Sequence, residues 1–122
     1  MNNFGFKELL VWQKAIDLAD LIISVTKNLD TKNKHYRLQE QIESAAASVA
    51  CNIAEGKGRN SKKEFIQYLY IARGSLYETI TLAIIFHKRK WINDDTYQKI
   101  EAVSFEIASM IKGLINSLKK KL

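Results

Sequence analysis

The stretch that decides the fold runs from residue 35 to residue 65 and reads HYRLQEQIESAAASVACNIAEGKGRNSKKEF. Its apolar side chains recur every three or four residues, which is the spacing of one helix face; they are Leu38, Ile42, Ala45, Ala46, Val49 and Ile53. Most of them are small, so another helix can approach closely. The pattern stops at Gly56-Lys57-Gly58, where we expect glycine to adopt the left-handed conformation that ends many helices. We predict a helix over 35–56.

The end of the same stretch carries the start signal of another helix. Ser61, followed three residues later by Glu64, forms a capping box in which a hydroxyl and a carboxylate satisfy free backbone N–H groups. An apolar face follows at helical spacing and consists of Phe65, Leu69, Ala72, Leu76 and Ala83. A short turn between two helices makes them antiparallel.

Two further helices flank this pair. Residues 7–28 carry apolar side chains at 3-4-3-4 spacing, and others widen that face; the first set is Leu9, Trp12, Ile16, Ala19 and Ile23, and the second is Val11, Leu18, Ile22 and Val25. The last helix begins after Asn93-Asp94-Asp95, whose side chains suit a helix N-terminus. Its apolar face consists of Ile100, Val103, Ile107, Met110, Leu114 and Leu118.

Composition agrees with a small all-α protein. A chain of 122 residues is the size of one domain, and the absence of proline leaves little turn chemistry for a β-sandwich. Because the connections are short, we predict an up-down-up-down antiparallel four-helix bundle over residues 1–122. The single cysteine, Cys51, is typical of a reducing compartment, and the longest nearly apolar run, 45–50, is far below the roughly 20 residues that span a bilayer. We expect a cytoplasmic protein that is not membrane-bound.

Positive charge gathers at one end of the predicted bundle. The chain has 19 Lys and Arg against 13 Asp and Glu, a net charge of +6 that favours acidic partners such as nucleic acid. The antiparallel topology brings together the first turn, the 57–63 connection and the C-terminus, with a local net charge of +5. The candidate nucleic-acid-binding residues are Lys57, Arg59, Lys62, Lys63, Lys119, Lys120 and Lys121. Alternatively, they only solubilise the protein and complement helix dipoles.

A second apolar row on the third helix predicts self-association. It consists of Ile66, Tyr70, Tyr77 and Ile84, about 100° around the helix from the first face. Because one face suffices in a monomeric bundle, we expect this row to be buried against another copy. Two alternatives remain open: a broad core face with tyrosines at its edge, and aromatic rings that stack bases beside Arg73.

Polar residues near the end of the second helix predict a structural network. Asn52 and Glu55 lie near the apolar face, and we expect them to bond with Arg73 or Glu78 on the third helix. Buried polar groups must be hydrogen-bonded, so such a network would fix the register of the two helices.

No arrangement of residues indicates catalysis, a metal site or a cofactor. The chain lacks Glu-x-x-His, HExxH, a phosphate loop and a nucleophile elbow. One alternative is the Asp17/Asp20 and Glu40/Glu43 set, which resembles the carboxylates of all-α Mg²⁺-dependent nucleotide pyrophosphohydrolases. Their angular positions point them away from one another, so we interpret them as a solvated face.

Several blocks of sequence together resemble a known family. They are Phe6-x-x-Leu9-x-Val11-Trp12-Gln13-Lys14-Ala15, Gln41 through Ala47-Ser48, Asn52-Ile53-Ala54-Glu55-Gly56-x-Gly58-Arg59, Ser61-x-x-Glu64-Phe65 and Ala72-x-Gly74-Ser75-x-x-Glu78. The chain resembles the bacterial four-helix-bundle family encoded in intervening sequences of 23S rRNA genes. That family is in turn similar to the accessory variability determinant of diversity-generating retroelements, a basic homopentamer that binds nucleic acid and a reverse transcriptase.

The resemblance implies a pentameric bundle without known catalytic activity. With the charge pattern, it favours a non-enzymatic homo-oligomer that binds RNA or a nucleic-acid-handling protein through its basic ends. A purely structural oligomer without nucleic-acid binding is the alternative, and an Mg²⁺-dependent pyrophosphohydrolase is the third hypothesis.

Overall fold

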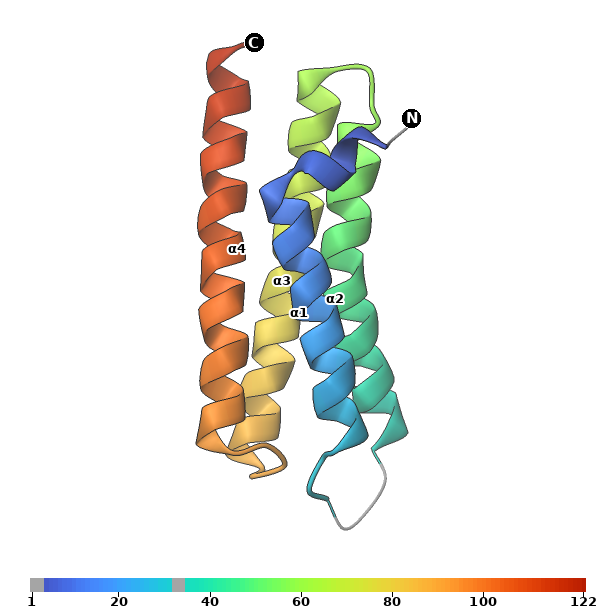
Figure 1. The fold of residues 1–122 in the computed structure, drawn as a ribbon, viewed down its shortest axis with the longest axis vertical. Coiled ribbons are helices and arrows are strands. Elements are labelled where there is room, and N and C mark those ends of the chain that lie inside the picture. Colours follow the sequence, from blue (N-terminus) through green and yellow to red (C-terminus); the bar gives the residue numbers. More distant parts are fainter. Residues whose placement is uncertain (1–3, 32–34) are drawn as a thin grey trace.

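Four α-helices follow one another in the computed structural model, which describes residues 4–31 and 35–122. A 3-10 helix, η1 (Gly5–Glu8), precedes α1 (Leu10–Lys27), α2 (Tyr36–Lys57), α3 (Lys62–Lys88) and α4 (Asp94–Lys120). Successive helices run in opposite directions along one long axis (Figure 1). The predicted all-α, up-down-up-down four-helix bundle is confirmed.

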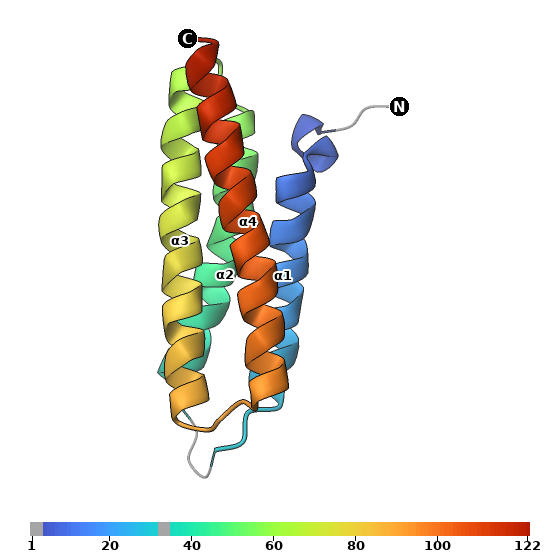
Figure 2. The same ribbon diagram turned by 90° about the vertical axis from the view of Figure 1, so that its left-hand side faces the viewer.

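The helices pack around a single apolar core. Each of α1 and α3 contacts both α2 and α4, so the four helices occupy the corners of a square (Figures 1 and 2). The largest fully buried side chains come from every helix and include Leu18, Ile42, Leu69, Phe86 and Ile107. All five residues of the predicted face of the third helix are buried, as are five of the six on the second, Leu38 being half-buried.

A glycine sets the closest approach of α2 to α3. Gly56 lies inside α2 and is buried; a Cβ atom there would be 2.7 Å from Tyr68 Cβ and 2.9 Å from Phe65 Cδ1. The helix ends at Lys57, and the residue that caps it, Gly58, has a φ of −78°. The prediction of a left-handed glycine was therefore wrong, because Gly56 serves helix packing and Gly58 keeps a right-handed conformation.

The left-handed residue occurs instead in the connection between α3 and α4. Lys90 has a φ of 62°, and its N–H donates to the His87 carbonyl while the Trp91 N–H donates to the Phe86 carbonyl, each at 2.9 Å. These two bonds form a Schellman motif, which satisfies carbonyls at a helix end. The Phe86 and Trp91 rings, 5.2 Å apart, close the motif with an apolar contact.

The predicted helix starts at Ser61 and near Asn93 are confirmed. The Ser61 hydroxyl accepts a 3.1 Å hydrogen bond from the Glu64 N–H, and the Asn93 side chain accepts one of 2.8 Å from the Thr96 N–H. The helix predicted over 7–28 is divided instead, because Leu9 is extended between η1 and α1.

The core faces of α1 and α4 are rotated from the predicted ones. In α1, Ile16 and Ile23 are exposed, whereas the side chains predicted to widen the face include the buried Val11, Leu18 and Ile22. In α4, Ile100 and Ile107 are buried as predicted. The rest of the buried face consists of Ser104, Ile111 and Ile115. The other residues of the predicted face are only half-buried; they are Val103, Met110, Leu114 and Leu118. Both helices carry apolar residues around more than half of their circumference, so spacing alone selects no single face.

One helix, α3, is long and apolar enough by length and composition to cross a membrane. The core helix of a soluble bundle meets the same criterion, and α3 buries its apolar face between α2 and α4. This feature alone is weak evidence for a membrane span.

The contact at Gly56 predicts opposite effects for two glycine substitutions. Gly56→Ala is expected to lower the free energy of unfolding by about 1–3 kcal/mol, because the new methyl group must push α2 away from α3. Gly74→Ala is the matched control, since no atom lies within 4 Å of a Cβ there and helical alanine is favoured over glycine by about 0.5–1 kcal/mol. Urea unfolding of both variants measures the difference; equal effects would contradict the close approach.

The left-handed Lys90 predicts a stabilising substitution. Lys90→Gly is expected to raise the free energy of unfolding by about 0.5–1 kcal/mol, because glycine adopts this conformation without the steric cost of a Cβ atom. Lys88→Gly, in the last turn of α3, serves as the control and is expected to destabilise the protein. Thermal unfolding followed by circular dichroism distinguishes them.

Candidate nucleic-acid interface

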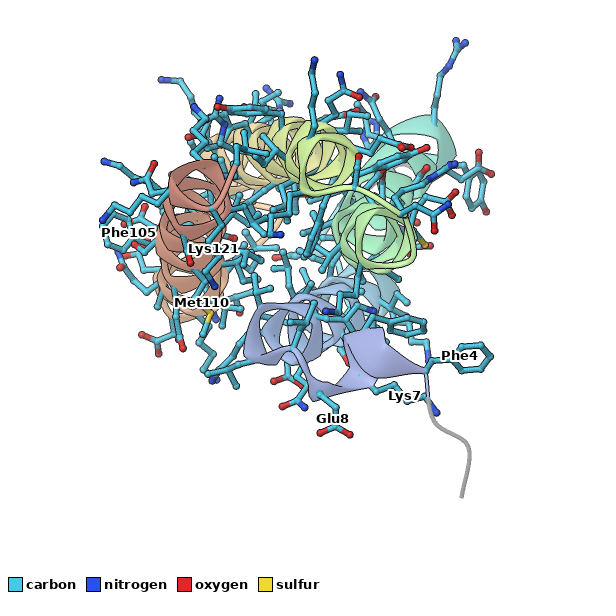
Figure 3. The ribbon with its side chains drawn as sticks, turned by 90° about the horizontal axis from the view of Figure 1, so that it is seen from above. Phe4, Lys7, Glu8, Phe105, Met110 and Lys121 are labelled. Carbon is cyan, nitrogen blue, oxygen red and sulfur yellow. The ribbon has the colours of Figure 1, made fainter. Side chains whose placement is uncertain are left out.

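The bundle brings the predicted basic residues to one end. The turn between α2 and α3, the last turn of α4 and η1 all lie there (Figure 1). Figure 3 looks onto this end, where Lys7 and Lys121 lie on opposite sides. All seven candidate side chains are exposed: Lys57, Arg59, Lys62, Lys63, Lys119, Lys120 and Lys121.

Arg59 differs from the lysines because its charge is already engaged. Its guanidinium lies 2.7 Å from the Glu55 carboxylate, donates to the Tyr68 hydroxyl and covers the Tyr68 ring, with Cζ 4.9 Å from the ring centre. Tyr68 and then Glu55 raise the pKa of Arg59 above its ordinary value. Arg59 therefore holds the corner between α2 and α3 and is less available to an outside anion than the lysines are.

Among the described residues, five lysines at this end have no ion-pair partner. The ion pairs within residues 4–31 and 35–122 are Lys14–Glu106, Arg59–Glu55 and His87–Asp94, so none involves Lys57, Lys62, Lys63, Lys120 or Lys121. Each of these ammonium groups can approach an anion without first breaking an ion pair. Together they form a positive surface that is capable of binding phosphate groups.

Lys119 contacts the neighbouring helix. Its Nζ atom lies 5.6 Å from the centre of the Tyr70 ring, and the Arg73 Cζ atom lies 4.8 Å from the same centre. The nearby Lys119 ammonium, with a smaller contribution from the Arg73 charge, lowers the pKa of the Tyr70 hydroxyl. The spacing of residues within single helices gave no sign of this contact between α3 and α4.

The structure divides the row that was predicted to be an oligomer interface. Ile66 is buried, with 7% of its surface exposed, because it faces the core of the same chain. Its assignment to an interface was therefore wrong. The other three residues of the row, Tyr70, Tyr77 and Ile84, are 37%, 53% and 46% exposed, and the α3 surface beside them also carries exposed Ile71 and Ile85.

The four residues of the predicted polar network do not bond with one another. Asn52 donates to the Ser48 carbonyl and hydroxyl, and Ser48 accepts from the Ser75 hydroxyl at 2.9 Å, so a serine pair joins α2 to α3. Glu78 accepts from Gln41, Glu55 pairs with Arg59, and Arg73 lies over Tyr70. The register of α2 on α3 thus rests on several small contacts, and the prediction of one network was wrong.

The carboxylates considered as magnesium ligands are dispersed. Asp17, Asp20 and Glu40 are exposed, and half-buried Glu43 accepts a short hydrogen bond from the Thr26 hydroxyl. Within the described part of the chain, no three His, Cys, Asp or Glu side chains are grouped so that they could hold a metal ion.

A broad hollow lies at the opposite end of the bundle. It measures about 1000 Å³ and is lined by the end of α1, the end of α3 and the connection to α4. Its charged lining is mixed, with Asp30 and Asp94 beside Lys88 and Lys90, so it favours neither sign of ligand. A smaller hollow of about 550 Å³ lies beside Cys51 and Arg59.

Comparisons with known proteins agree with this fold. A family model described as "23S rRNA-intervening sequence protein" matches residues 7–113. A solved structure from Bacteroides thetaiotaomicron, described as a protein of unknown function from the S23 ribosomal protein family, is 26% identical, with a TM-score of 0.81. The similarity covers 87% of this chain and 98% of that one. No protein of curated function matches. The chain therefore belongs to the 23S rRNA-intervening sequence protein family.

Proposed function

We propose that this protein is a non-enzymatic, cytoplasmic homo-oligomer that binds RNA, alone or within a ribonucleoprotein, through the basic end of its bundle. The observation that carries the proposal is a group of five lysines from three separate segments at one end, none of them in an ion pair with a described residue: Lys57, Lys62, Lys63, Lys120 and Lys121. A solubilising role requires charge but does not require its concentration on one face.

Electrostatics supports a polyanion as the partner. The end carries eight Lys and Arg side chains against three carboxylates, a net charge of +5, so its field attracts anions. A nucleic-acid strand that contacts these lysines releases its condensed counterions, and this release is favourable at low salt. Contacts between lysine and phosphate do not depend on base identity, so we expect weak sequence preference.

The outer surface of α3 supports self-association. Tyr77 and Ile84 are joined there by Ile71 and Ile85, and all four side chains are between 40% and 53% exposed. Exposed apolar surface on this scale is costly in water unless another surface covers it. A second copy of the same chain offers the same apolar row, and in a closed ring the basic ends would repeat around one rim.

RNA binding predicts a loss of affinity when the lysines at the end of α4 are removed. The triple variant Lys119→Ser, Lys120→Ser and Lys121→Ser is expected to bind every RNA sequence more weakly, without a change of preference among sequences. The slope of log affinity against log salt should fall by about 0.7 for each phosphate group that the variant no longer neutralises. Fluorescence anisotropy with a labelled single-stranded RNA at about 50 mM and about 200 mM salt measures both quantities.

A matched triple variant at the other end controls for total charge. Lys27→Ser, Lys88→Ser and Lys99→Ser removes the same charge from exposed sites near the opposite end and is expected to bind more tightly than the first triple variant. Equal weakening by the two triples would indicate a general charge effect. Absence of RNA binding even at low salt would leave the purely structural oligomer.

Self-association predicts a molecular mass in solution above that of one chain. Light scattering is expected to give several times the 14.0 kDa of one chain, and the family resemblance favours five subunits. The double variant Tyr77→Glu and Ile84→Glu should reduce the mass, because it places two charges in the apolar row. Phe105→Glu, on the outer face of α4, is the control and should keep the wild-type mass (Figure 3). A stable 14.0 kDa monomer at micromolar concentration would contradict self-association.

A further inference from the structure

Tyr70 lies between two cations that come from different helices. The Arg73 Cζ atom is 4.8 Å from the centre of its ring, and the Lys119 Nζ atom is 5.6 Å from it. Tyr70 and Arg73 are about one turn apart on α3, whereas Lys119 belongs to the last turn of α4. A phenol hydroxyl and two positive side chains thus meet across the α3–α4 seam, near the basic end.

Among the described residues, the Arg59–Tyr68 pair includes a neutralising carboxylate, which the group of Tyr70, Arg73 and Lys119 lacks. Arg59 has the same relation to a ring, with Cζ 4.9 Å from the centre of Tyr68, but the Glu55 carboxylate neutralises it at 2.7 Å. Beside Tyr70 a second cation is present instead of a carboxylate, and neither Arg73 nor Lys119 is in an ion pair with any residue of 4–31 or 35–122. Two like charges at one ring repel each other, and a bound anion would offset this repulsion.

We propose that Tyr70, Arg73 and Lys119 together bind a phosphodiester group of an RNA backbone. This inference rests on the proposed function and assigns one contact of that interface. The guanidinium offers a fork of N–H donors, the ammonium offers a mobile point charge, and the phenol offers one O–H donor. Hydrogen bonds from such charged donors to phosphate oxygens are short and strong.

The geometry favours phosphate over a stacked base. Both cations lie over the Tyr70 ring, so a base would have to displace one of them before it could stack there. The pKa of the Tyr70 hydroxyl is lowered, first by the nearby Lys119 ammonium, which agrees with a positive potential at the oxygen. A strand bound here would run along the α3–α4 seam and continue toward Lys120 and Lys121.

Single substitutions with matched controls test this site. Arg73→Gln and Lys119→Gln are each expected to weaken binding of a labelled single-stranded oligouridine about three- to tenfold and to lower the salt slope by about 0.7. Tyr70→Phe should weaken binding about two- to fivefold with an unchanged slope, because it removes a donor and no charge. Arg37→Gln, Lys27→Gln and Tyr36→Phe make the same chemical changes at exposed positions outside the site and should bind as the wild type does.

The outcomes separate this site from the wider interface. Circular dichroism of each variant must show wild-type helix content, so that weaker binding cannot be attributed to unfolding. If the Lys119–Lys121 triple variant weakens binding while Arg73→Gln and Lys119→Gln do not, the site is wrong and the proposed function stands. If the wild type binds no RNA, both are wrong. Displacement of RNA by inorganic phosphate at micromolar concentration would assign the group to free phosphate and overturn the assignment to RNA.

Discussion

The approach of α2 to α3 at Gly56 is the constraint on which the rest of the bundle depends. Phe65 and Tyr68 already occupy the space that a methyl group at position 56 would need. The α2 backbone therefore lies directly against these two side chains of α3. That proximity lets residues 58–61 connect them without a long loop and brings the Arg59 guanidinium onto Tyr68. The same contact therefore closes the core and fixes the end of the molecule on which the lysines gather.

Two arginines of this protein have similar aromatic contacts but different charged neighbours, and the neighbours determine whether each charge stabilises the fold or faces a ligand. Arg59 and Arg73 each lie over a tyrosine ring, but only Arg59 has a carboxylate partner among the described residues. A neutralised cation contributes to the packing of its own chain and adds little to the outer field. An unpaired cation beside a second one, as at Tyr70 and Lys119, contributes chiefly to that field. Net charge alone would count both arginines equally.

The helices and their order were predictable from sequence because caps and apolar spacing are local signals. Features that depend on which of two roles a residue takes could not be predicted from the sequence. Apolar residues occur around most of the circumference of α1, so their spacing could not show that Ile16 faces the solvent and not the core. Gly56 could either end its own helix or allow a second helix to pack closely against it. Lys90 has the left-handed conformation that we expected of a glycine. The basic end followed from topology, whereas the contact of Tyr70 with Lys119 requires the register of α3 on α4.

The short connections have a consequence for how the chain folds. Residues 58–61 and 89–93 join α2 to α3 and α3 to α4, so these two helix pairs form with little loss of loop entropy. The packing of α1 on α4 and of η1 on the end of α2 joins segments that are more distant in the sequence. Proteins dominated by local contacts fold in about microseconds to milliseconds. The α2–α3–α4 hairpins are accordingly expected to form first, with α1 docking last onto a surface already in place.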